Sequence, residues 1–200
     1  MADARADRDL WASGAGGDAD AFGELFRRHA RAIYNFCFRR TGAWSTAEDL
    51  ASVVFLEAWR RRRSLMPYGT SALPLLYGIA LRVTHNHRRS LRRYQAALDR
   101  VPPTVDEPDP ADDVSERIDA ARRMLLLRQA LDLLPRRDRE VVELCSWTEL
   151  SQRQVAEVLG VPLGTVKSRL ARAQQRLARY LTDLAALADP PPADSPQGGR

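Results

Sequence analysis

Apolar residues recur at intervals of three and four positions along the first half of the chain, which predicts amphipathic helices. One such helix is expected from Ala21 to Thr41, with Gly42 closing it. Ser45 and Glu48 have the spacing of a capping box and predict the start of a second helix, with Leu50, Val54 and Ala58 toward a core. A third helix is expected from about Pro74, and its buried stripe consists of Leu76, Ile79, Ala80 and Val83.

The second half of the chain has the same periodicity. One helix is predicted over residues 121–134 and another from Pro135 onward. The stretch from Leu150 to Leu181 then predicts two helices joined by a tight turn, because Ser151 and Gln154 form a capping box, Gly160 suits the turn and Pro162 suits the next helix start. This spacing is typical of a helix-turn-helix.

The final helix has two different faces. Val166, Leu170, Ala173 and Leu177 form a narrow apolar stripe. The opposite face has small residues near its start, which allow close approach to base edges, and flanking Lys and Arg side chains that suit guanine or phosphate contacts. Arg169 and Arg176 lie nearer the core edge, where a phosphate contact or an internal salt bridge is expected. A plain helical hairpin within a bundle is the alternative interpretation.

Charge is unevenly distributed along the chain. Residues 21–100 carry fifteen Arg and five acidic residues, whereas residues 122–180 carry twelve basic and six acidic residues. Between them lie residues 99–120, which contain four Pro. Residues 101–121 carry seven acidic residues and one Arg, so this segment is predicted to be an extended acidic linker. Two basic modules suggest contact with a polyanion, although two solvated helical domains with Arg-rich surfaces would give the same composition. The linker is either passive or an acidic strand that occupies a basic nucleic-acid channel.

The remaining residues argue against several classes of function. Cys37 and Cys145 lack metal or disulfide spacing and are expected to be buried thiols, and His29 is expected at the core edge rather than as a metal ligand. The sequence shows no paired catalytic carboxylates, phosphate loop or catalytic triad, so we expect neither an enzyme nor a cofactor. The charged N-terminus and the lack of a long apolar run predict a cytoplasmic protein without membrane insertion.

Two motif sets together resemble one known family. The segments LPRRDREVVEL and LSQRQVAEVLGVPLGTVKSRLARAQQRL resemble region four of extracytoplasmic-function sigma factors, which are subunits of bacterial RNA polymerase. AEDLASVVFLEAW and LPLLYGIALRVTHNHRR resemble the polymerase-docking helix and the promoter-melting helix of region two in the same family. The order of the segments, with a linker between them, also matches.

This resemblance implies an all-α chain of two small helical domains joined by a flexible acidic linker. The expected divisions are a disordered tail at 1–18, a region-two domain at 19–98, the linker at 99–120, a region-four domain at 121–184 and a second disordered tail at 185–200. The implied partners are core RNA polymerase and promoter DNA, and an anti-sigma factor is a further partner common in this family. A stand-alone helix-turn-helix transcriptional regulator is the alternative function.

The resemblance also implies three groups of contact residues. The minus-thirty-five element of the promoter would be read by Thr165, Lys167, Ser168, Ala171 and Arg172. The minus-ten element would be recognised and melted by Tyr77, Arg82, Asn86, Arg88 and Arg89, a helix whose aromatic, amide and Arg groups suit melted nucleic acid. Polymerase would be bound by Asp49, Leu50, Ser52, Val53 and Leu56.

Overall fold

The structure is a computed structural model that describes residues 5–67, 69–98, 124 and 127–188. Within these ranges the regular secondary structure is helical and contains no strand, which confirms the predicted all-α class. The predicted linker at 99–120 lies outside the described residues.

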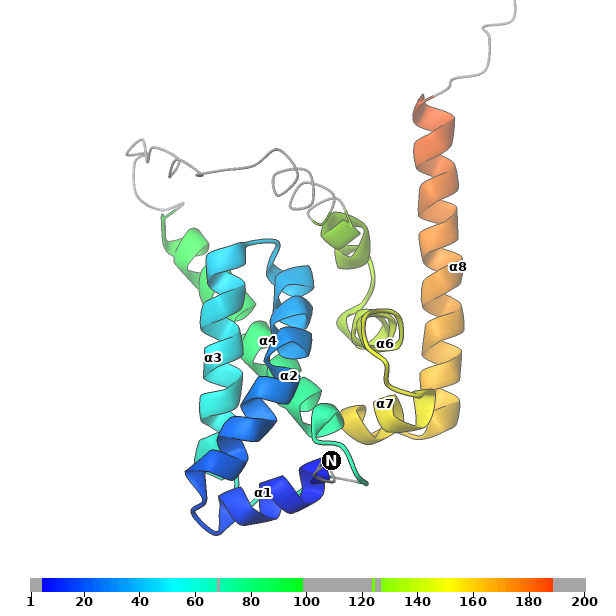
Figure 1. The fold of residues 1–200 in the computed structure, drawn as a ribbon. Coiled ribbons are helices and arrows are strands. Elements are labelled where there is room, and N and C mark those ends of the chain that lie inside the picture. Colours follow the sequence, from blue (N-terminus) through cyan, green and yellow to red (C-terminus); the bar gives the residue numbers. More distant parts are fainter. Residues whose placement is uncertain (1–4, 68, 99–123, 125–126, 189–200) are drawn as a thin grey trace, which may run out of the picture.

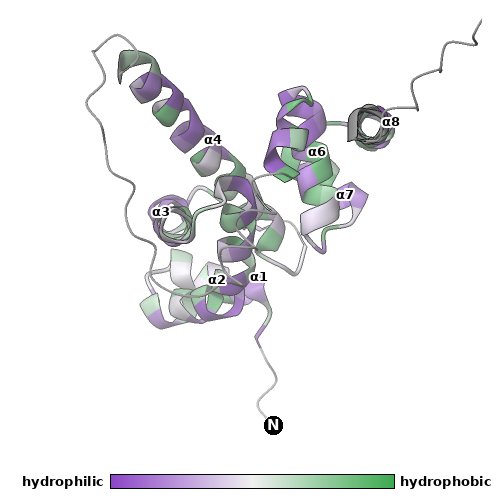
Figure 2. Cartoon of the chain, turned by 90° about the horizontal axis from the view of Figure 1, so that it is seen from above, coloured by the Kyte–Doolittle hydropathy of each residue, from purple (hydrophilic) through white to green (hydrophobic). Residues whose placement is uncertain are grey.

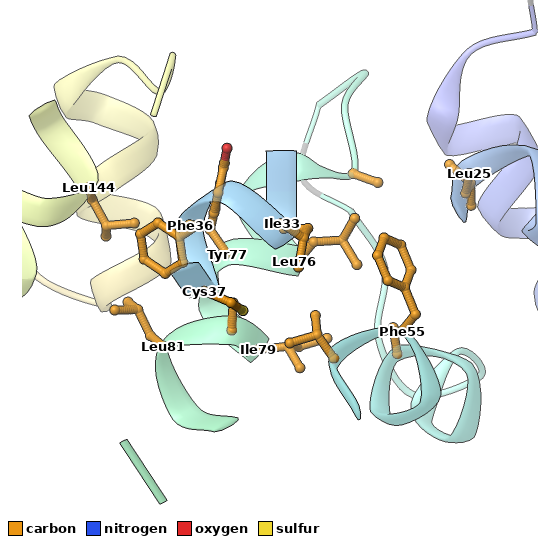
Figure 3. Close-up of a cluster of buried hydrophobic side chains, with 14 of the residues drawn as sticks. Leu25, Ile33, Phe36, Cys37, Phe55, Leu76, Tyr77, Ile79, Leu81 and Leu144 are labelled. Carbon is orange, nitrogen blue, oxygen red and sulfur yellow. The ribbon is translucent and has the colours of Figure 1, made fainter. Parts of the chain in front are cut away.

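Four helices form the first bundle: α1 (Asp7–Ala15), α2 (Ala19–Thr41), α3 (Trp44–Arg61) and α4 (Leu73–Leu98). The long α2 packs against α1, α3 and α4 (Figure 1). The core forms where apolar stripes of α2, α3 and α4 meet, around Ile33, Phe36, Phe55, Leu76 and Ile79 (Figure 3). Gly42 adopts φ +73° and ends α2 as predicted, since a residue without Cβ adopts this left-handed conformation at little cost.

Helix α1 corrects the prediction of a disordered tail at 1–18. Leu10 and Trp11 are fully buried against the bundle. The indole N–H of Trp11 donates to the carbonyl oxygens of Leu65 at 2.8 Å and Arg62 at 3.1 Å, which lie after α3. Gly16 and Gly17 end this short helix, which is held to the bundle by two large buried side chains and by the carbonyl oxygens of Arg62 and Leu65.

Asp7 joins α1 to two other segments of the bundle. Its Oδ2 lies 2.6 Å from Nε2 of His29 and accepts the backbone N–H of Ala72 at 2.9 Å, while Oδ1 accepts from Arg28 at 3.2 Å. Burial raises the pKa of Asp7, but the Ala72 N–H and the His29 side chain outweigh it, so its pKa lies below the ordinary value. His29 is buried as expected, and its partner is a carboxylate 22 positions earlier in the chain.

The predicted capping box of Ser45 and Glu48 is wrong. Helix α3 already begins at Trp44, with Ala43 as an N-cap that makes no side-chain hydrogen bond. The ring of Trp44 stacks on Phe38 of α2 with 3.9 Å between centroids. This stacking, directly after the Gly42 turn, brings Trp44 into the first helical turn and leaves Ser45 inside the helix.

The second bundle contains a helical segment at 127–132, α6 (Arg136–Trp147), α7 (Gln152–Leu159) and α8 (Leu163–Ala188). Leu131, Leu134, Val142 and Ala173 form a small core between α8 and the elements before it. Helix α8 includes residues 185–188, so this part of the predicted C-terminal tail is helical, and residues 189–200 lie outside the described chain.

The two bundles pack directly against each other. Leu144 of α6 lies beside Phe36 and Leu81 of the first bundle (Figure 3), and Phe36 also contacts the ring of Trp147 edge-on at 6.3 Å. Helix α7 packs against α4 near its N-terminal end, whereas the far end of α4 projects away with mostly hydrophilic residues (Figure 2). One continuous apolar core therefore extends across both bundles.

Candidate nucleic-acid interface

The helix-turn-helix is formed by α7 and α8. Ser151 accepts the backbone N–H of Gln154, and the Gln154 side chain accepts the backbone N–H of Ser151, so the predicted capping box is confirmed. Gly160 has φ +63° and makes the turn between the helices. Val155 and Val166 are buried between α7 and α8, and this packing fixes which face of α8 is exposed.

The exposed face of α8 contains four of the five predicted minus-thirty-five residues. Lys167, Ser168, Ala171 and Arg172 are exposed, and Thr165 is half-buried. The Ser168 hydroxyl donates to the carbonyl of Thr165 at 3.1 Å, and Arg172 Nε donates to the carbonyl of Ser168 at 3.3 Å. These bonds within the helix hold polar groups on the exposed face without withdrawing them into the core.

A groove of about 960 Å³ runs along this face between α6 and α8. Its lining includes five arginines and two acidic residues: Arg136, Arg137, Arg169, Arg172, Arg176, Asp138 and Glu140. Arg176 donates to Asp138 at 3.2 Å, which makes it an internal salt-bridge residue, one of the two roles expected for it. The excess of guanidinium groups gives the groove a positive field that suits a phosphate backbone.

The predicted minus-ten residues do not form one surface on α4. Arg82 and Asn86 line a cavity of about 350 Å³ between α3 and α4, where Val53 of α3 also lies. Arg88 and Arg89 line a different cavity, which faces α6. Arg88 donates to Asp132 of the second bundle at 2.6 Å. The structure therefore brings Arg82 and Asn86 together and separates them from the other two arginines.

Tyr77 is a core residue, which corrects its assignment as a contact for melted DNA. Its side chain is only 4% exposed and meets the ring of Phe36 edge-on at 5.1 Å. Burial raises the pKa of the Tyr77 hydroxyl. The ring faces α2 because it continues the buried stripe of Leu76 and Ala80, so in this arrangement no base can stack on it.

Four of the five predicted polymerase-binding residues lie on the exposed face of α3. Asp49 and Ser52 are exposed, and Val53 and Leu56 are each 45% exposed, which places two apolar side chains beside polar ones in solvent. Leu50 is only 7% exposed and belongs to the core, so its assignment as a direct contact is corrected. Leu50 belongs to the same buried stripe of α3 as Val54, and its packing fixes the orientation of the exposed face.

The described part of the chain contains no group of three or more His, Cys, Asp or Glu side chains arranged to hold a metal ion. None of its helices has the combination of length and apolar character needed to cross a membrane. Cys37 is buried as expected, and burial raises the pKa of its thiol to about 12, whereas Cys145 is only half-buried.

Comparison with known proteins shows that two parts of the chain match models of known protein domains. Sigma-70 region 2 matches residues 25–94, which cover most of α2 together with α3 and most of α4. Sigma-70 region 4 matches residues 124–177, which include α6, α7 and the exposed face of α8. The chain belongs to the ECF RNA polymerase sigma factors. The helix-turn-helix and the α3 surface of this sigma factor thus lie within its two matched regions.

Individual relatives agree with this family. The chain is 36% identical to the ECF RNA polymerase sigma factor SigE of Mycolicibacterium smegmatis over 168 residues, which are 79% of this chain and 60% of SigE. It is 31% identical over 192 residues to the RNA polymerase sigma factor NccH of Alcaligenes xylosoxydans xylosoxydans, covering 90% of this chain and 97% of NccH. The chain therefore spans about three fifths of the length of SigE and almost all of NccH.

A solved structure has the same arrangement of helices. CnrH, in complex with the cytosolic domain of CnrY, aligns with this sigma factor at a TM-score of 0.65 and 25% identity, and the alignment covers 88% of this chain and 97% of CnrH. The likeness extends over both bundles, since it covers far more than either one alone.

The sequence prediction missed several residues that lie at this interface. Arg136 and Arg137 line the groove beside α8, and Arg139 lies on the same helix facing α4. The basic run LPRRDRE signalled them, but their position beside α8 depends on the packing of α6. Asp132 was also missed as the partner of Arg88, because the two residues are 44 positions apart.

Proposed function

We propose that this sigma factor binds core RNA polymerase and directs it to specific promoters as a non-catalytic subunit in the cytoplasm. The observation that carries the proposal is the exposed face of α8, where Lys167, Ser168, Ala171 and Arg172 lie beside an arginine-lined groove. A helix of this kind enters the major groove of DNA, with small residues near the bases and basic residues on guanine or phosphate. In this proposal it reads the minus-thirty-five element.

The exposed face of α3 supports a docking role. Val53 and Leu56 are large apolar groups in solvent, and Asp49 and Ser52 lie beside them as polar contacts. Apolar groups surrounded by polar ones are typical of a protein interface. We assign these four residues to polymerase binding, with Leu50 as the buried support beneath them.

Helix α4 supports a role at the minus-ten element, in two parts. Arg82 and Asn86 lie in the cavity next to the α3 face, where a melted strand would pass close to the polymerase contact. Arg88 and Arg89 face α6, and Arg88 is paired with Asp132 there. Arg89 is already exposed, but Arg88 reaches DNA only after the second bundle moves away, so the proposal includes separation of the bundles on the promoter.

An inhibitory protein partner is part of the proposal. CnrH, which shares this arrangement of helices, was solved in complex with the cytosolic domain of CnrY. We infer that an anti-sigma factor binds this chain, with the exposed α3 face as the surface over which it competes with polymerase. In such a complex polymerase binding would be blocked without any change to α8.

Transcription with purified core polymerase tests the proposal. Adding the chain to core enzyme and a promoter library should produce defined new transcript starts. The combined variant Lys167→Ala and Arg172→Ala should lower use of the upstream element by roughly tenfold or more, because each contact to a base is worth about 1–3 kcal/mol. Arg179→Ala, two turns further along α8, is the matched control and should have little effect.

The same experiment separates this function from that of a stand-alone regulator. A sigma factor should bind promoter DNA weakly alone and tightly with core polymerase, as measured by mobility shift. Tight operator binding without polymerase, together with an absence of new starts, would refute the proposal. Equal loss of polymerase binding in the Lys167→Ala and Arg172→Ala variant would refute the division of roles between the bundles.

A further inference from the structure

A cavity of about 160 Å³ lies where the first bundle meets the second. Among the residues that the structure describes, its lining consists only of basic side chains, six arginines and one histidine. Helix α2 contributes Arg40 and helix α6 contributes Arg136 and Arg139. The remaining four come from α4: His85, Arg88, Arg89 and Arg92. Side chains from both bundles therefore form one positive site, which is partly open to solvent.

Nearby carboxylates compensate only part of this charge. Glu143 pairs with Arg40, Asp132 pairs with both Arg88 and Arg139, and Glu140 pairs with Arg136. Arg89 and Arg92 form no ion pair with any described residue. Three carboxylates thus face six guanidinium groups within the described part of the chain. The cavity therefore retains about three positive charges that attract an anion.

A buried donor adds a second, independent observation. The Arg40 side chain is 3% exposed, and its Nε has no hydrogen-bond partner among the described residues. A buried N–H without a partner is costly, and an anion bound beside it would supply the missing acceptor. Burial, and next the charge of Arg136, lower the pKa of His85, so this ring is neutral at pH 7 and adds a hydrogen-bonding group without further charge.

We propose that this cavity binds a small phosphate-type polyanion, with inorganic diphosphate as its simplest form. Guanidinium groups bind phosphate oxygens through paired N–H donors, and several of them from different helices can surround one such ion. No described residue of the lining has a Phe, Tyr or Trp ring, so a nucleotide would be held by its phosphates, with the base outside. A DNA strand is not favoured, because α6 covers this side of α4 and the volume is small.

Binding of the anion connects the two bundles. Arg40 and Arg92 belong to the first bundle and Arg136 belongs to the second, so an anion held by all three stabilises their contact. In that arrangement Arg88 stays paired with Asp132 and away from DNA. The consequence for transcription rests on the proposed function: the polyanion should oppose promoter melting by keeping the bundles together.

Calorimetric titration of diphosphate into the full chain tests the site without polymerase. The test variant combines Arg92→Gln with Arg136→Gln. The matched control combines Arg93→Gln in the first bundle with Arg153→Gln in the second, which removes the same charge from exposed positions outside both the cavity and the groove beside α8. The wild type should bind one diphosphate per chain, the test variant should bind roughly tenfold more weakly or worse, and the control should change by less than about twofold.

Thermal unfolding gives a second measurement. Diphosphate should raise the unfolding temperature of the wild type and the control but not that of the test variant, because a ligand that binds only the folded state stabilises it. ATP should bind with similar affinity if the phosphates are the recognised group. Binding of orthophosphate as strong as that of diphosphate would overturn the polyanion assignment.

Three results would overturn the proposal. The first is the absence of saturable diphosphate binding to the wild type. The second is an equal loss of affinity in the test and control variants, which would show only general attraction by a basic protein. The third is binding of a short single-stranded oligonucleotide that requires Arg92 and Arg136, when binding of diphosphate does not require them. Because none of these measurements uses polymerase, failure of the site is distinguishable from failure of the proposed function.

Discussion

The buried ion pair between Arg40 and Glu143 should control whether the two bundles remain together. Each side chain is 3% exposed, and the pair joins α2 of the first bundle to α6 of the second. Changing Glu143 to Gln preserves the shape but leaves the Arg40 charge buried without its counter-ion. Removal of one partner from a buried pair costs about 3–5 kcal/mol.

Because this pair joins two bundles, their separation can limit the destabilisation, which is not possible for a pair within one domain. Arg40 becomes solvated if the bundles separate, so the penalty cannot exceed the free energy needed to separate them. We therefore expect Glu143→Gln to open the chain rather than unfold it. Replacing both residues, Arg40→Met with Glu143→Leu, should restore a closed chain, since apolar pairs of similar volume are often as stable as a buried ion pair.

Small-angle scattering and chemical denaturation measure the two effects. Glu143→Gln should increase the radius of gyration and give unfolding in two stages, whereas the double replacement should match the wild type. Glu57→Gln is the control, because Glu57 and its partner Arg61 are 35% and 40% exposed within the first bundle, and a surface pair contributes only about 0–1 kcal/mol. A compact Glu143→Gln variant with an unfolding free energy within about 1 kcal/mol of the wild type would refute the reasoning.

Three further predictions concern single positions. Asp7→Asn should lower the unfolding free energy by about 1.5–3 kcal/mol near pH 7. Because the pKa of Asp7 is lowered in the folded state, its contribution is present above the ordinary pKa of 3.8 and is lost as the pH falls below it, so denaturation curves of wild type and variant should converge in acid. Val53→Asp should weaken polymerase binding in a pull-down assay and leave unfolding unchanged, whereas Leu50→Ala should cost about 2–5 kcal/mol in denaturation, and the reverse pattern would contradict their placement. Gly160→Ala should destabilise the second bundle by about 1 kcal/mol in a thermal melt because of its φ of +63°, and an unchanged melt would show that the turn relaxes without strain.

Much of the fold could be predicted because its signals are local. The end of α2 at Gly42 and the capping box at Ser151 depend on residues within four positions of each other. The start of α3 could not be predicted in the same way, since the stacking of Trp44 on Phe38 competes with the apparent box at Ser45. Helix α1 was missed because Trp11 is held by carbonyls more than fifty positions away.

Some of the candidate contact residues could also be predicted from local signals, whereas others depend on tertiary packing. On α8 the apolar stripe alone fixes the exposed face, so Lys167, Ser168, Ala171 and Arg172 follow from periodicity. On α4 periodicity leaves the outward direction open, because the helix is covered on more than one side. Packing therefore buries Tyr77 in the core and directs Arg88 toward the second bundle, where it pairs with Asp132.

The sequence by itself determined most of the helices, the helix-turn-helix and the family, since these depend on spacing within short segments and on the order of motifs. Only the tertiary structure decided which charges meet. Arg40 and Glu143 are 103 positions apart, and the basic cavity collects side chains from α2, α4 and α6. The physical reason is that a side chain's partner across a core is set by how whole helices pack, and that packing depends on the sum of many weak contacts rather than on any local pattern.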